Sequence, residues 1–154
     1  MKENIRQTVT KATFEVFEKM FFVFLEPVED TPFKYDSVSC IDFSGRAAGG
    51  LCLMMSRGLT AMMAENMLGC EPSEITEQMI EDCSKEAANM VCGNFLRKMS
   101  EQDVFNLSLP QYAPMDQAAG KGLILSGPDD VVVHFESEDE HLQVRLAWEE
   151  AGEA

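Results

Sequence analysis

Helical periodicity occurs twice in this sequence, and each time it is followed by short segments that alternate between apolar and polar residues. The first helix is predicted over residues 3–24, where Val9 and Phe17 share one apolar face. A second long helix is predicted over residues 73–100, with acidic residues in its first turns, as the helix dipole favours. This recurrence indicates two related halves, each a helix followed by strands, as a diverged duplication would give.

The remaining elements define the fold class. Strands are predicted over 37–43 and 48–55, and a short helix follows between Ser56 and Gly69. Further strands are predicted after the second long helix, over 105–109, 122–126, 131–136 and 142–148. Because the connections are short, we expect an α+β fold with a mostly antiparallel sheet and helices packed on one face. The prediction is one domain over residues 1–150 and a loose tail over 151–154.

The charge of the chain argues against several kinds of partner. Its 154 residues contain 27 Asp and Glu but only 12 Lys and Arg, which gives a formal net charge of −15. Such a surface repels phosphate backbones and anionic lipids, so we expect neither nucleic acid nor a membrane as partner. The N-terminus lacks a signal-peptide pattern, and the apolar run at 20–25 is too short to span a bilayer. We therefore expect a soluble cytoplasmic protein.

The cysteines and histidines form no pattern typical of a metal site or a catalytic thiol. No two cysteines have the Cys-x-x-Cys spacing, and most lie within apolar patterns, so reduced core thiols are expected at Cys40, Cys52, Cys83 and Cys92. His134 and His141 have no further ligands at metal-binding spacing. We expect no metal or other cofactor to be bound by this chain.

The second long helix carries a polar stripe away from its apolar face. At 100° per residue, one line along the helix contains Asp82, Glu86, Asn89 and Gly93. Glycine within a helix costs roughly 1 kcal/mol relative to alanine, and Asn89 and Asn94 are also weak helix formers. The stripe offers a carboxylate, a carboxamide and bare backbone to an approaching molecule. The alternative is a solvated polar face in which Gly93 relieves a crowded contact.

The pattern D-x-x-x-E-x-x-N-M-x-x-G-N over residues 82–94 resembles the signature of the CheC/CheX/FliY family of chemotaxis phosphatases. Pro110 is similar to a downstream proline of that family, and the predicted order of elements is similar over nearly the whole chain. The resemblance implies that the chain removes the phosphoryl group from the aspartate of a phosphorylated CheY-type response regulator. The Mg²⁺ ion that the reaction needs would then belong to the regulator.

The resemblance also implies roles for individual residues. Asn89 would orient the attacking water, and Glu86 would pair with the active-site lysine of the regulator. Supporting roles are implied for Asp82, Gly93 and Asn94. A carboxamide suits the water because it can donate and accept hydrogen bonds at once.

The first long helix has a degenerate form of this motif. Lys11, Glu15 and Glu18 occupy the equivalent positions, so a glutamate replaces the water-orienting asparagine. We expect that site to be inactive, so that the chain has one site. In this respect it resembles the CheX-like branch of the family, whose members form homodimers. The alternative function is a non-catalytic adaptor module of a chemotaxis or flagellar-switch assembly, because the same fold serves there as a scaffold.

Overall fold

The computed structural model describes residues 1–30, 32–123, 127 and 129–150. Its helices are α1 (Lys2–Phe21), α2 (Arg57–Leu68) and α3 (Glu77–Met99), with short 3₁₀ turns at Pro72–Glu74, Met115–Gln117 and Ala119–Lys121. Its strands are β1 (Glu26–Val28), β2 (Ser37–Ser44), β3 (Ala47–Met55), β4 (Asn106–Leu107), β5 (Gln111–Pro114), β6 (Val131–Ser137) and β7 (Glu140–Glu150).

The strands form one sheet in the order β1-β6-β7-β3-β2-β4, with β5 also paired to β2, and its pairs are antiparallel. The two halves of this sheet correspond to each other: β1, β6 and β7 are neighbours in one half, and β5, β2 and β3 are neighbours in the same way in the other half. The helices follow this relation, since α1 packs on β6 and α3 packs on β2. The structure therefore confirms the α+β fold and the two related halves.

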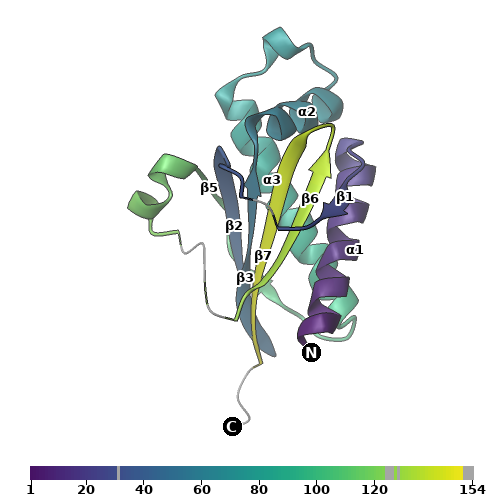
Figure 1. Cartoon of the computed structure of the whole chain (residues 1–154). Coiled ribbons are helices and arrows are strands. Elements are labelled where there is room, and N and C mark those ends of the chain that lie inside the picture. The colour runs from purple at the N-terminus through teal and green to yellow at the C-terminus, as the bar shows by residue number, and fades with distance from the viewer. Residues whose placement is uncertain (31, 124–126, 128, 151–154) are drawn as a thin grey trace.

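The helices cover one face of the sheet, and the main core lies between the two layers (Figure 1). Strand residues such as Leu53 point into this core, which also contains Phe17 of α1 and Phe95 of α3, and all three are fully buried. Alternate strand residues point to the opposite face, where Met54 packs in a smaller cluster under Ala118. Helix α3 is thus held against the sheet on one side and leaves its other side to solvent.

Both long helices are shorter than their patterns predict. Helix α1 ends at Phe21 because Phe22 adopts a left-handed conformation (φ 54°) and its N–H bonds back to the carbonyl of Phe17. Helix α3 begins at Glu77, where the Thr76 hydroxyl accepts a hydrogen bond from the backbone N–H of Met79 (3.1 Å). In both cases the cap, rather than the apolar periodicity, sets the boundary.

The central strands β2, β3, β6 and β7 are confirmed, and each of their ends lies within two residues of the predicted one. The edges of the sheet differ from the prediction. The strand predicted over 105–109 is reduced to β4, and the short strands β1 and β5 were not predicted. The predicted strand 122–126 lies mostly outside the described residues, and Gly122 and Leu123 are not in a strand. The predicted tail at 151–154 also lies outside the described residues.

Two cysteines differ from the expectation of reduced core thiols. Cys40 and Cys52 form a disulfide between β2 and β3, because the register of the hairpin places them directly opposite each other with Cα atoms 4.2 Å apart. The sequence places each cysteine in a strand, but it does not fix that register. Cys83 and Cys92 are free and buried in α3, as predicted. Burial raises the pKa of Cys92 to about 12, so this thiol stays protonated at neutral pH.

Both histidines contact other side chains. Nε2 of His134 lies 3.2 Å from Oδ1 of Asp30, and the ring of His141 packs on that of Phe33. Among the described residues, no group of three or more His, Cys, Asp or Glu side chains could hold a metal ion. In the same part of the chain, no helix is both long and apolar enough to cross a membrane.

Candidate functional site

The stripe predicted on the second long helix lies on the solvent side of α3. Asp82 and Asn89 are exposed and Glu86 and Gly93 are half-buried, whereas the opposite side of the helix is fully buried in the main core. At 1.5 Å per residue, Glu86 precedes Asn89 by about 4.5 Å along the axis, and Gly93 follows by about 6 Å. These four residues, called here the α3 strip, therefore form one continuous surface.

The two residues at the centre of the strip have no partner within the chain as described. Neither Glu86 nor Asn89 has a side-chain hydrogen bond or an ion pair with a described residue. Asp82 differs, because its Oδ1 accepts a hydrogen bond from Nε2 of Gln78 (2.9 Å). The neighbouring cation, Lys85, is bound to Glu81 instead (2.8 Å). The strip thus presents an uncompensated carboxylate and a free carboxamide to solvent.

Gly93 has no packing role that the structure reveals. A Cβ atom built on Gly93 meets no described atom within 4 Å outside the helix's own adjacent backbone. This excludes, for the described residues, the alternative that the glycine relieves a crowded contact. The helix carries the cost of a central glycine without an internal reason, which is consistent with the close approach of another molecule.

Asn94 does not join the strip but links the two long helices. Its Nδ2 donates a hydrogen bond to Oε2 of Glu15 in α1 (3.3 Å), and Nζ of Lys98 lies 2.9 Å from the other oxygen of that carboxylate. The hydrogen bond from Lys98, with a smaller contribution from Asn94, holds the pKa of Glu15 below its ordinary value. In the degenerate motif of α1, the retained glutamate is therefore engaged within the chain, while Lys11 and Glu18 are exposed.

Glu15→Gln should lower the free energy of unfolding at pH 7 but not near pH 3. Because the pKa of Glu15 is lower in the folded state, its stabilisation is present above the unfolded value of about 4.5 and is lost as the pH falls through the folded value. The pair is partly exposed, so the difference at pH 7 should not exceed about 0.5 kcal/mol. Urea unfolding at both pH values measures it, and an equal difference at both would contradict the assignment.

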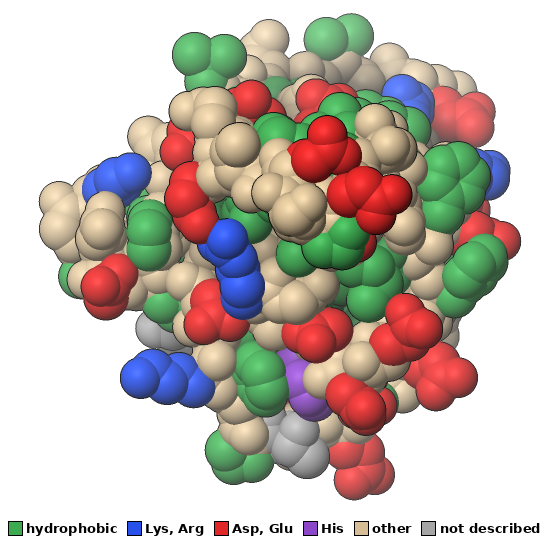
Figure 2. Space-filling view, turned by 90° about the horizontal axis from the view of Figure 1, so that it is seen from above, with side chains coloured by type: hydrophobic (Ala, Val, Ile, Leu, Met, Phe, Trp, Pro, Cys, Tyr) green, Lys and Arg blue, Asp and Glu red, His purple; other side chains and the backbone are tan. Residues whose placement is uncertain are grey.

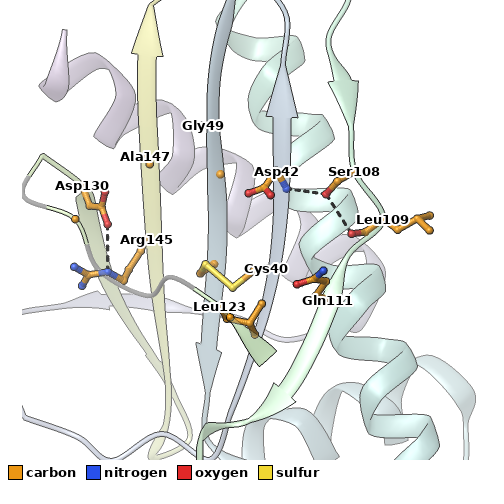
Figure 3. Close-up of a pocket in the computed structure, with 14 residues that line it drawn as sticks. Cys40, Asp42, Gly49, Ser108, Leu109, Gln111, Leu123, Asp130, Arg145 and Ala147 are labelled. Atoms are coloured by element: carbon orange, nitrogen blue, oxygen red, sulfur yellow. Dashed lines mark hydrogen bonds and ion pairs between the residues drawn. A yellow bond between two sulfur atoms is a disulfide. The ribbon is translucent and has the colours of Figure 1, made fainter. Parts of the chain in front are cut away.

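A separate hollow lies on the sheet face opposite α3 (Figure 3). Its floor includes the disulfide, and its polar groups form two separate pairs: the N–H of Asp42 donates to Oγ of Ser108 (3.0 Å), and Oδ2 of Asp130 lies 3.6 Å from Nε of Arg145. No pattern in the sequence predicts this hollow. It lies away from the α3 strip, and we assign no function to it.

The surface agrees with the acidic composition. Viewed onto the end of the molecule that carries α2, carboxylates are scattered among hydrophobic side chains and outnumber the few cations (Figure 2). One cation that sequence reasoning did not single out, Arg97, continues the α3 strip one helical turn beyond Gly93 and is exposed. The motif ends at Asn94. Only continuing the helical period beyond the motif could have identified this arginine from the sequence.

The comparisons with known proteins agree with this fold and motif. The family model of the chemotaxis phosphatase CheX matches residues 37–135, which include all of α3. The chain is similar to the chemotaxis protein CheX from Vibrio vulnificus, with 21% identity, coverage of 97% of this chain and 99% of that chain, and a TM-score of 0.77. It is also similar to a chain of the CheX–CheY–BeF3–Mg complex from Borrelia burgdorferi, with 16% identity, coverage of 94% and 97%, and a TM-score of 0.71.

A more distant likeness in fold is to the middle domain of FliM. The middle domain of FliM from Vibrio alginolyticus has 14% identity, coverage of 94% of this chain and 90% of that one, and a TM-score of 0.56. No curated protein matches the chain by sequence. At these identities the solved structures show the shared fold alone, whereas the CheX family model spans well over half of the sequence. The chain therefore belongs to the CheX family of chemotaxis phosphatases.

Proposed function

We propose that this chain accelerates hydrolysis of the aspartyl phosphate of a phosphorylated CheY-type response regulator, and that the α3 strip is its one active site. The observation that carries the proposal is Asn89, an exposed carboxamide without an internal partner in the middle of a helix and one turn from an uncrowded glycine. The complex of the Borrelia burgdorferi relative supports CheY as the partner type.

In the proposed mechanism, Asn89 enters the active site of the regulator and orients a water molecule for in-line attack on phosphorus. Its amide can accept a hydrogen bond from the water and donate another at the same time. A carboxylate in this place would be repelled by the phosphoryl oxygens. The acyl phosphate is already labile, so positioning of the water supplies most of the acceleration.

Glu86 would fix the docking register by pairing with the active-site lysine of the regulator. It lies about 4.5 Å from Asn89 along the helix, and it has no cation partner among the described residues. In this proposal the Mg²⁺ ion belongs to the regulator, and no residue of this chain is assigned as a metal ligand. Asp82 would support the strip through its hydrogen bond with Gln78.

Glu86→Gln should lower kcat/KM roughly tenfold and change kcat much less, because the lost ion pair weakens docking rather than chemistry. The control is Glu18→Gln, which removes the same charge from an exposed position of α1, at the place that corresponds to Asn89. Both are measured as phosphate release over a range of regulator concentrations. Equal effects of the two substitutions would contradict the role of Glu86.

The test of the function is phosphate release from a cognate receiver domain phosphorylated by a small phosphodonor with Mg²⁺. Acceleration by the wild-type chain is the expected result. Binding to the receiver without acceleration would instead support the adaptor alternative, which the likeness to the FliM middle domain keeps open. The two functions thus give different results in one assay.

We also propose, from the family resemblance, that the chain forms a homodimer and acts in the cytoplasm, where receiver domains occur. The sheet has short strands at its edges, β1 on one side and β4 and β5 on the other, which offer backbone groups for pairing between copies. Sedimentation at several protein concentrations tests this, and a monomer throughout would contradict it.

A further inference from the structure

An exposed cation extends the α3 strip toward the end of the helix. Arg97 follows Gly93 by four residues, so both lie on the same face of α3. Its guanidinium forms no ion pair with a described residue, whereas the next residue, Lys98, is bound to Glu15 at 2.9 Å. Other cations, such as Lys34, also lack an ion pair with a described residue, but Arg97 is the one that lies on the line of the α3 strip.

Arg97 borders a shallow hollow between the end of α3 and the segment that leads to β4. The hollow is also lined by Gly93, Leu96, Ser100, Glu101, Phe105 and Leu107. Val104, which lies in the chain between Asp103 and Phe105, is 82% exposed. The carboxylate of Asp103, which lies in the same wall, is already bound by Arg46 (2.8 Å) and by Oγ of Ser100 (2.6 Å). The hollow therefore combines an apolar floor with a cation that has no internal partner.

We propose that Arg97 is a docking residue that binds a carboxylate on the surface of the phosphorylated regulator, while the hollow receives an adjacent apolar side chain. This inference rests on the proposed function of the α3 strip. Arg97 lies about 12 Å beyond Asn89 along the helix axis, so it contacts the regulator outside its phosphorylation site. It acts on docking and not on the attack of water.

The strip then has a defined polarity that selects one orientation of the partner. Carboxylates lie at its start, on Asp82 and Glu86, Asn89 and Gly93 follow, and the cation of Arg97 lies one turn beyond its end. A regulator must present its lysine near Glu86 and a carboxylate near Arg97. Docking in the reverse direction would bring like charges together at both ends, which excludes it. A regulator without the carboxylate loses the second contact, so Arg97 also contributes to the choice of regulator.

The test compares Arg97→Glu with Lys34→Glu. Lys34 is exposed, has no ion pair with a described residue and lies in the segment before β2, so its reversal changes the net charge equally. Two quantities are measured: the kinetics of phosphate release from the phosphorylated receiver, and the Kd for the receiver loaded with beryllium fluoride and Mg²⁺. Arg97→Glu should raise KM and Kd at least tenfold and leave kcat within twofold, whereas Lys34→Glu should leave all three within twofold. Thermal unfolding checks that both variants are folded.

Three results of the variant comparison would overturn the inference. Equal effects of the two reversals would assign the loss to net charge, and a fall in kcat at unchanged KM would place Arg97 in the chemical step. An unchanged Kd for Arg97→Glu would show that no contact exists. If the wild-type chain binds the receiver without accelerating hydrolysis, the phosphatase proposal fails while the Kd comparison still decides the role of Arg97. A wild-type chain that neither binds nor hydrolyses would overturn both.

Discussion

Asn89→Ala is expected to lower the turnover of the phosphorylated regulator by roughly 100-fold, the size of effect that follows when a reactant loses its orientation. The side chain is exposed and has no hydrogen bond with a described residue, so its removal should leave the fold intact. Docking should change little, because Glu86 keeps its contact with the regulator. Single-turnover phosphate release at saturating chain concentration measures the chemical step apart from docking.

Two further variants sharpen this experiment. Asn66→Ala removes another exposed helical carboxamide, on α2, and should leave turnover unchanged. Asn89→Asp keeps the shape of the side chain but adds a charge, and it should be as slow as Asn89→Ala because the carboxylate repels the phosphoryl oxygens. If Asn89→Ala were as fast as the wild type, the proposed site would be wrong. If the aspartate variant were fast, the residue would act as a base rather than as an orienting amide.

The sequence predicts those parts of the fold whose signals are local. The apolar periodicities of the two long helices and the alternation in β2, β3, β6 and β7 identify elements that the structure confirms. The edge strands could not be identified from alternation, because β1 has three residues and β4 has two, too few to show a pattern. The disulfide between Cys40 and Cys52 depends on the register of a hairpin, which two separate strand patterns do not define.

The same distinction applies to the candidate site: features that depend on local sequence could be predicted, and features that depend on distant residues could not. The α3 strip follows from the helical period alone, so the exposure of Asp82 and Asn89 could be predicted. The side chain of Asn94 could not be placed, because its partner Glu15 is 79 positions away and is brought near by the packing of α1 on α3. The same packing brings Glu15 of the degenerate motif into contact with Asn94 and Lys98. The sequence shows only that this motif lacks the asparagine.

Gly93→Ala should stabilise the chain and weaken its docking at the same time. A methyl group there meets no described atom within 4 Å outside the adjacent helix backbone, so the gain in helix propensity of about 1 kcal/mol should appear in the free energy of unfolding. In the complex the same methyl group would lie where the regulator approaches the bare backbone. Overpacking by one methyl group costs about 1–3 kcal/mol in a close-packed contact, which corresponds to at least a roughly fivefold increase in Kd.

The opposite signs of these two effects distinguish a binding glycine from a structural one. A glycine needed for packing or for its backbone conformation would lose stability on substitution, and docking would suffer only as a consequence. Gly120→Ala is the control, since Gly120 also has open space around its Cβ position but lies in a 3₁₀ turn and not on α3. Urea unfolding and the Kd for the receiver loaded with beryllium fluoride measure both effects. A more stable Gly93→Ala chain that binds as tightly as the wild type would show that the regulator does not approach this backbone. A less stable one would show that the space around Gly93 is filled.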